Sequence, residues 1–156
     1  MSSYESSEPT DFERVGAERL RQIVDDFVSQ MTSDPMIGFF FHDVDTERLA
    51  RMEFQFTARA LGAKIRYEGR PIRQAHASRR IMGGQFARRA TLLKEAFEAH
   101  GVSADVVARL MTHVEALRPL VTSQGGSHCE HQDSGGGLVT AWSADTGQVN
   151  VEESWD

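Results

Sequence analysis

The chain has a single cysteine, Cys129, and therefore cannot form an intrachain disulfide. This scarcity favours a reducing compartment. No Cys-x-x-Cys-His motif is present, so covalent attachment of a c-type haem is not expected. The first residues contain neither a basic region nor an apolar run, and no stretch is long enough to cross a bilayer. We therefore expect a cytoplasmic protein with no signal peptide and no membrane partner.

The chain also lacks an excess of positive charge, because 17 basic residues stand against 23 acidic ones for a net charge of −6. A general nucleic-acid-binding protein would be basic, so nucleic acid is not an expected partner. The signs are nevertheless segregated. Residues 64–89 contain eight basic residues and one acidic residue, whereas residues 130–156 contain six acidic residues and no lysine or arginine. The basic stretch is either a solvated face or a site for an anion, such as the carboxylates of a cofactor.

No strand pattern precedes residue 123, and the apolar periodicity up to that point is helical. The sequence predicts a helix that begins at a Thr10–Glu13 capping box and stops at residues 33–35, and a short helix that ends at Phe41. Further helices are expected from Asp45 or Thr46 to about residue 61, around residues 71–76, from 84 to about 100, and from 104 to 122. Residues 1–10 would form a flexible N-terminal segment, residues 11–123 one domain, and residues 124–156 a glycine-rich acidic tail with a hairpin pattern around residues 145–147.

Residues 67–76 form the stretch around which the chain is organised. Gly69 ends a loop, Pro71 suits the first position of a helix, and His76 follows about one and a half turns later. A lone histidine on a helix can be a solvated or core residue. It can also bind iron without neighbouring protein ligands if a porphyrin supplies the other four donors. We interpret His76 as an iron ligand, with Tyr67 and the nearby arginines at the rim of its pocket.

Two charged residues, Glu53 and Arg89, lie on the apolar stripes of separate helices. Burying either charge alone would be unfavourable. Both side chains could extend to water, or they could pair inside a shared cavity.

Taken in order, the motifs resemble those of the truncated haemoglobins, group I. The matching segments are 15–17, 26–27, 33–35, 40–41, 60–63, 67–70, His76, Ile81 with Phe86, and 117–121. The resemblance covers roughly residues 11–123 and implies an all-α, two-on-two helical globin fold with a C-terminal extension. It also implies a haem b cofactor. His76 would be the metal ligand and proximal residue, and the other cofactor-binding residues would be Phe40, Phe41, Leu49, Tyr67, Arg70, Arg73, Ile81 and Phe86.

The chain departs from the family pattern at the ligand side of the haem. The family usually has a tyrosine where Val28 stands, often a glutamine at the place of Glu53, and a small apolar residue at the place of Arg89. The resemblance therefore implies binding of diatomic gas, oxygen or nitric oxide, without the usual oxygen-stabilising network. Nitric oxide dioxygenation is one expected activity. Peroxidase-like catalysis by Arg89 and Glu53, and a gas sensor or carrier whose tail contacts a reductase or another partner protein, are the alternatives.

The remaining histidines are assigned weaker roles. His42 follows Phe41 and could become a sixth iron ligand, whereas His100 and His113 have the pattern of surface or helix-face residues. In the tail, His128, Cys129 and His131 offer three donors for a metal, an alternative that rests on composition alone.

Overall fold

The computed structural model describes residues 7–123, and these residues form α-helices and one short 3-10 helix. The helices are α1 (Asp11–Val15), α2 (Ala17–Ser33), η1 (Gly38–Phe41), α3 (Thr46–Ala60), α4 (Ile72–His76), α5 (Gly83–Ala99), α6 (Ala104–Ala116) and α7 (Arg118–Val121). No helix in the described range is long and apolar enough to cross a membrane. The predicted hairpin in the tail lies outside the described residues.

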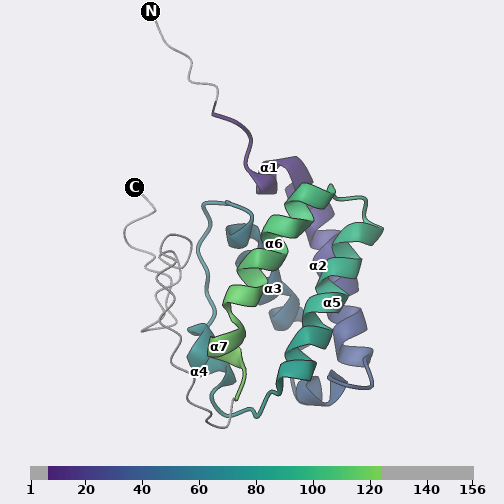
Figure 1. The fold of residues 1–156 in the computed structure, drawn as a ribbon, viewed down its shortest axis with the longest axis vertical. Helices are drawn as coiled ribbons and strands as arrows, with labels where there is room; N and C mark the ends of the chain where they lie inside the picture. Colours follow the sequence, from purple (N-terminus) through teal and green to yellow (C-terminus); the bar gives the residue numbers. More distant parts are fainter. Residues whose placement is uncertain (1–6, 124–156) are drawn as a thin grey trace, which may run out of the picture.

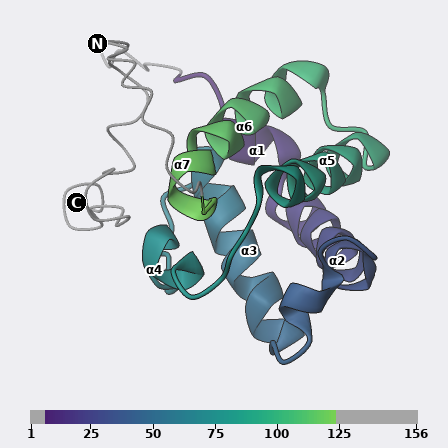
Figure 2. The same cartoon turned by 60° about the horizontal axis from the view of Figure 1, so that its bottom comes forward.

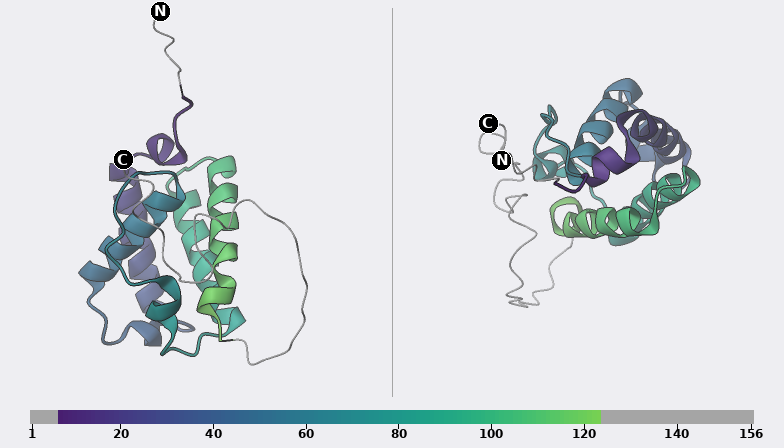
Figure 3. Two further views of the ribbon diagram at one scale, coloured as in Figure 1. Left: turned by 90° about the vertical axis from the view of Figure 1, so that its left-hand side faces the viewer. Right: turned by 90° about the horizontal axis from the view of Figure 1, so that it is seen from above.

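Two layers of paired helices make up the fold. Helix α2 packs against both α3 and α5, and α5 packs against α6. Figure 3 (left) separates α2 and α3 on one side from α5 and α6 on the other. Figure 1 shows the short α4 and α7 close together at one end, in agreement with their mutual contacts. This arrangement is the two-on-two sandwich that the sequence predicts.

The core lies between α2, α5 and α6, where apolar residues recur at helical spacing. Phe27 and Met31 of α2 have no exposed surface. The apolar stripe that the sequence predicts for this helix is buried throughout, at Leu20, Ile23, Val24, Phe27, Val28 and Met31. Buried apolar residues of α5 and α6, such as Phe97 and Leu110, belong to the same core cluster as those of α2. The stripe of α3 differs, because none of its predicted apolar positions is fully buried. Those side chains face a cavity instead of a packed core.

Two predicted helices are each divided in the structure. The first is interrupted at Gly16, whose φ of 86° lies in the left-handed region that glycine tolerates. The last helix ends at Ala116, and α7 begins at Arg118, because Pro119 has no N–H to continue the hydrogen-bond ladder. A smaller shift occurs at Pro71, which caps α4 from outside so that Ile72 is the first helical residue.

Other expected helix ends are confirmed. Thr10 and Glu13 form the predicted capping box, with each side chain accepting from the other residue's backbone N–H. Asp45 caps α3 by accepting hydrogen bonds from the backbone N–H groups of Glu47 and Arg48. Gly101 follows α5 with a positive φ of 71°, as expected for a helix-terminating glycine.

Candidate functional site

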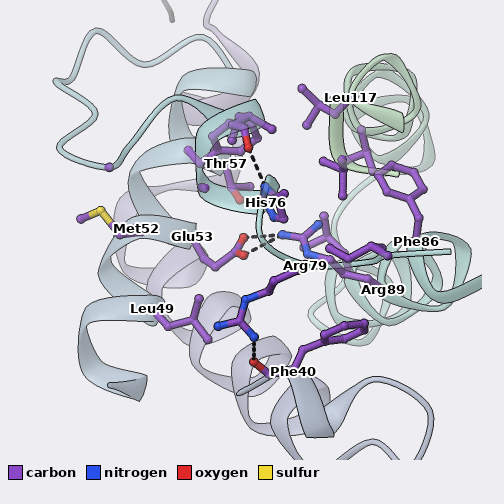
Figure 4. Close-up of a pocket in the computed structure, with 18 of the residues that line it drawn as sticks. Phe40, Leu49, Met52, Glu53, Thr57, His76, Arg79, Phe86, Arg89 and Leu117 are labelled. Carbon is purple, nitrogen blue, oxygen red and sulfur yellow. Dashed lines mark hydrogen bonds and ion pairs between the residues drawn. The ribbon is translucent and has the colours of Figure 1, made fainter. Parts of the chain in front are cut away.

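A cavity of about 410 Å³ lies between the two helical layers. Its lining comes from η1, α3, α4 and α5, and from the inward faces of α6 and α7. The volume is within the range of about 300–1,000 Å³ that is typical of small-molecule sites. Figure 4 looks into it, with Leu49 and Met52 on one wall and Phe86 and Leu117 on the other. A mostly apolar wall with a few converging polar groups is the usual composition of a cofactor or ligand pocket.

The structure brings together ten of the eleven residues that the sequence assigns to the site. Arg73 is the exception, because its side chain is exposed and is not part of the lining. Ile72 and His76 are four residues apart and share the inward face of α4, whereas Arg73 is about 100° round the helix from Ile72. The ten residues that line the cavity are Phe40, Phe41, Leu49, Glu53, Tyr67, Arg70, His76, Ile81, Phe86 and Arg89.

The imidazole of His76 is held in one orientation by its own helix. Its Nδ1 lies 2.7 Å from the carbonyl oxygen of Ile72, so Nδ1–H donates and Nε2 keeps a free lone pair. Burial lowers the pKa of His76, and the positive charge of Arg89 adds to this effect, although the Ile72 carbonyl acts in the opposite direction. The ring therefore stays neutral at pH 7. A neutral imidazole with a fixed tautomer is the form that binds a metal.

Glu53 and Arg89 form an ion pair inside the cavity. Nη2 of Arg89 donates to both carboxylate oxygens of Glu53, at 2.7 and 2.6 Å. Their side chains are 14% and 26% exposed, so water screens the pair only partly. The guanidinium also lies 5.1 Å from the centroid of the Phe27 ring. The predicted pairing of α3 with α5 is confirmed, and the alternative in which both charges extend separately to water is wrong.

Figure 4 shows this pair in the middle of the site, with His76 above it and Arg79 below it. Both charges of the pair influence the pKa of His76, which places them within electrostatic reach of the imidazole. The cavity therefore brings a ring nitrogen of α4 with a free lone pair close to an oriented hydrogen-bond donor of α5.

The loop from residue 61 to 71 is held against α3 by two hydrogen bonds. Gln55 Nε2 donates to Glu68 Oε2 at 3.0 Å, and Glu68 N–H donates to Gln55 Oε1 at 2.9 Å. These two hydrogen bonds hold Tyr67 in the cavity wall. Its ring contacts the Phe56 ring edge-on, with 5.7 Å between the centroids. Burial raises the pKa of the Tyr67 hydroxyl, and the negative charge of Glu53 raises it further. The phenol therefore remains protonated and can act as a donor.

Gly69 allows the Tyr67 ring to take this place. A Cβ at residue 69 would lie 2.2 Å from Cζ and the hydroxyl oxygen of Tyr67. We expect Gly69→Ala to displace the ring from the cavity and to lower the free energy of unfolding by about 1–3 kcal/mol, as overpacking does. The measurement is urea denaturation followed by circular dichroism.

Gly84→Ala is the matched control for that experiment. Gly84 lies in α5, and an added Cβ would make only an ordinary 3.5 Å contact with the end of the Met36 side chain. Alanine in a helix should raise the free energy of unfolding by about 0.5–1 kcal/mol. Equal effects of the two variants would show that the Tyr67 ring does not depend on Gly69.

Several polar residues of the cavity were not predicted from the sequence. Arg79 lines it and donates from Nη1 to the carbonyl oxygen of Phe40, which ties the α4–α5 loop to η1 (Figure 4). His113, which the sequence assigns to the surface or to a helix face, also lines it. The spacing contained a signal for His113, because it follows the buried Leu110 by three residues. The sequence contains no comparable signal for Arg79, because this residue lies in the loop between α4 and α5, where no helical spacing applies.

The other histidines lie elsewhere. His42 is exposed and is not part of the lining, and His100 Nε2 is 2.6 Å from Asp26 Oδ2 at the surface. Within residues 7–123 there is no cluster of three or more His, Cys, Asp or Glu side chains that could hold a metal ion. The predicted alternative metal donors of the tail fall outside the described range.

Both the sequence and the structure are similar to those of known globins. Residues 10–123 match a family model described as bacterial-like globin. The chain is 29% identical over 129 residues to the group 1 truncated hemoglobin GlbN of Mycolicibacterium paratuberculosis, covering 81% of this chain and 95% of that protein. The structure is similar to truncated hemoglobin from Tetrahymena pyriformis, with a TM-score of 0.71, 20% identity and coverage of 74% and 100% of the two chains. A truncated oxygen-avid haemoglobin from Bacillus subtilis is similar with a TM-score of 0.66, 24% identity and the same coverage.

Proposed function

The chain belongs to the bacterial-like globin family, and on this premise we propose that it holds haem b through His76 and takes up a diatomic gas beside Arg89. The family and the two-on-two fold agree with the resemblance seen in the sequence. The cofactor is a haem with its iron, and the ligand class is diatomic gas. In this proposal His76 would bind the iron and Arg89 would contact the gas.

The chemistry of the cavity fits a haem. The wall is apolar where a tetrapyrrole needs it, with Phe40, Phe41 and Phe86 among its aromatic residues. Two exposed arginines, Arg70 and Arg79, lie where the lining meets solvent and suit the carboxylates of such a group. Tyr67 completes this rim, and the role of Arg73 toward the carboxylates stays a prediction. When bound, haem would supply an iron that accepts one donor from the protein and can take up a gas.

His76 is the protein's donor to that iron. The hydrogen bond to the Ile72 carbonyl fixes the tautomer that leaves Nε2 free, and the lowered pKa keeps the lone pair available. No other histidine of the described chain combines a place in the lining, a fixed tautomer and a position facing the ion pair. This combination is the single observation that carries the proposal.

Arg89 would supply hydrogen-bond donors to the gas. Glu53 engages Nη2 of the guanidinium, which leaves the other N–H groups for a polar ligand in the cavity. Glu53 thereby sets the orientation of Arg89. This arrangement supports oxygen binding and, at a finer level, nitric oxide dioxygenation. Rapid mixing of nitric oxide with the oxygenated ferrous protein tests the reaction, because dioxygenation gives nitrate and the ferric protein.

A second candidate function rests on the Glu53 carboxylate. An acidic group within 2.7 Å of a guanidinium resembles a general acid–base pair, in which Glu53 holds a proton of peroxide while Arg89 donates to developing charge. A peroxidase assay at neutral pH, with Glu53→Gln as the comparison, tests it. If both assays show no turnover, a carrier or sensor role remains.

The division into a globin domain and a tail leads to a separate prediction. The family match ends at residue 123, and the described helices form a continuous core within residues 10–123. A chain that ends at Ser123 should keep its helical circular dichroism and its haem absorption band. Loss of both on truncation would show that residues 124–156 belong to the core.

A further inference from the structure

The large apolar side chains that the described residues leave exposed gather at one place. Met36, Phe39 and Met82 are 46%, 60% and 52% exposed, and they are the large hydrophobic residues at the surface of the described range. Met36 approaches Gly84 beside Met82, and the Phe39 ring stacks on Phe40 at 4.2 Å between centroids. Scattered exposed hydrophobic residues need no explanation, but a cluster indicates an interaction surface.

The same surface is positively charged. Arg79 and Arg80 are exposed in the loop that precedes Met82, and Arg79 donates to the carbonyl oxygen of Phe40. Neither arginine has an acidic partner among residues 7–123. Helix α5 begins directly after Met82 without an acidic residue in its first turn, so its positive dipole end adds to the potential. We name this patch the loop surface; it consists of Met36, Phe39, Arg79, Arg80 and Met82.

The chain leaves the described fold at the loop surface. Ser123 N–H donates to the carbonyl oxygen of Ile81 at 2.9 Å, and its hydroxyl lies 3.4 Å from the carbonyl oxygen of Arg79. Residues 124–156 therefore start beside the two arginines. In Figure 2 the end of α7 lies close to the connection between α4 and α5, in agreement with these bonds.

The composition of residues 124–156 complements that surface. The segment has six acidic residues and no lysine or arginine, and it contains both tryptophans of the chain, Trp142 and Trp155. We propose that residues 124–156 dock on the loop surface of the same molecule, with carboxylates on Arg80 and apolar side chains on Phe39 and Met82. Because tethering to Ser123 gives the segment a high effective concentration there, weak contacts are sufficient.

The loop surface borders the cavity. Arg79, Phe40 and Ile81 belong to the cavity lining as well as to the neighbourhood of the loop surface. This inference concerns the protein surface and does not depend on which gas or reaction the site serves.

Acrylamide quenching of tryptophan emission tests the proposal in the full-length protein, with and without haem. Both tryptophans lie in the proposed docking segment, so the signal reports that segment alone. Raising the salt concentration from about 0.05 M to about 1 M shortens the Debye length to about 3 Å and should raise the quenching constant about two-fold. Arg80→Glu and Phe39→Ser should each raise it to a similar level at low salt.

Arg19→Glu is the matched control, because it makes the same change of charge at the opposite end of α5, near Gly101. It should leave the quenching constant unchanged, and circular dichroism should show that all variants are folded. Constants that are equal in wild type, Arg80→Glu and Phe39→Ser would overturn the proposal and leave the loop surface to an acidic partner protein.

Protein concentration separates docking within one molecule from docking between two. The proposal requires a quenching constant that is independent of concentration. A constant that falls with concentration, together with a dimer in sedimentation, would overturn it in favour of a second copy. Because the haem-free protein gives the same readout, a failure of haem binding and a failure of docking are distinguishable.

Discussion

His76→Ala should release most of the haem from this protein. The imidazole is the donor on α4 that faces the cavity with its tautomer fixed by Ile72. Losing an outer partner of a metal ligand typically lowers metal affinity about 10- to 100-fold, so loss of the ligand itself should lower haem affinity by at least about 100-fold. Haem transfer to an acceptor protein, followed by the absorption band, measures this change.

His113→Gln is the control, because His113 is the other histidine in the cavity wall. It should retain haem with an unchanged spectrum. The reverse result, haem lost in His113→Gln and retained in His76→Ala, would move the metal ligand to α6.

The same ligand predicts how haem binding depends on pH. A proton competes with iron for Nε2 of His76, and burial holds the pKa of this histidine below its ordinary value of about 6.5. Haem affinity should therefore stay constant from pH 8 to about 6.5 and fall only at lower pH, as protonation begins. A decline centred above pH 6.5 would contradict a lowered pKa.

Arg89→Leu should speed the dissociation of oxygen from the ferrous protein. The guanidinium supplies donors in a cavity where α2 provides none. A hydrogen bond from a charged donor contributes about 1.5–3 kcal/mol, which corresponds to dissociation faster by about 10- to 150-fold. Stopped-flow displacement of oxygen by carbon monoxide gives the rate. Arg51→Leu is the control, because Arg51 is exposed on α3 and does not line the cavity. Unchanged rates in Arg89→Leu would show that the donor points away from the ligand.

Glu53→Gln separates the orientation of Arg89 from its charge. The amide keeps the size of the carboxylate but can no longer hold Nη2 through two charged oxygens at 2.6 and 2.7 Å. Oxygen dissociation should accelerate less than in Arg89→Leu, and the pH dependence of ferric ligand binding should change. In a double-mutant cycle the two positions should couple by about 0.5–3 kcal/mol. Additive effects would show that the ion pair does not control the ligand.

Helical periodicity predicted most of the fold, because a buried stripe is a local pattern. Every predicted core position of α2 is buried, and the capping residues Thr10 and Asp45 act as their residue types suggest. The charges at Glu53 and Arg89 also stood out against local apolar stripes. Because burying either charge alone is unfavourable, pairing in a shared cavity was one of the two arrangements that the sequence offered. The motif order then supplied the family and the cofactor, which no single spacing could provide.

The errors came from positions where the chain leaves its regular path. A glycine with positive φ divides the first helix at residue 16, and Pro119 divides the last. The helical pattern of apolar residues continues on both sides of each break, so periodicity alone did not reveal the breaks. Arg79 lines the cavity because of the path of the loop after α4. Arg73 does not line it, because α4 is only five residues long and only one of its faces borders the cavity. Such placements depend on tertiary contacts that a one-dimensional pattern does not contain.

One helix of the folding core, α2, is separate from the cavity in this protein. No side chain of α2 lines the cavity, whereas α2 contributes several of the most deeply buried residues, including Phe27 and Met31. The Glu53–Arg89 ion pair of the cavity comes instead from α3 and α5, at partly exposed positions. Substitutions at Glu53 and Arg89 can therefore accumulate without opening a void among the fully buried residues of α2. The charges inside the cavity are thus free to vary in evolution, whereas the buried face of α2 is constrained by packing.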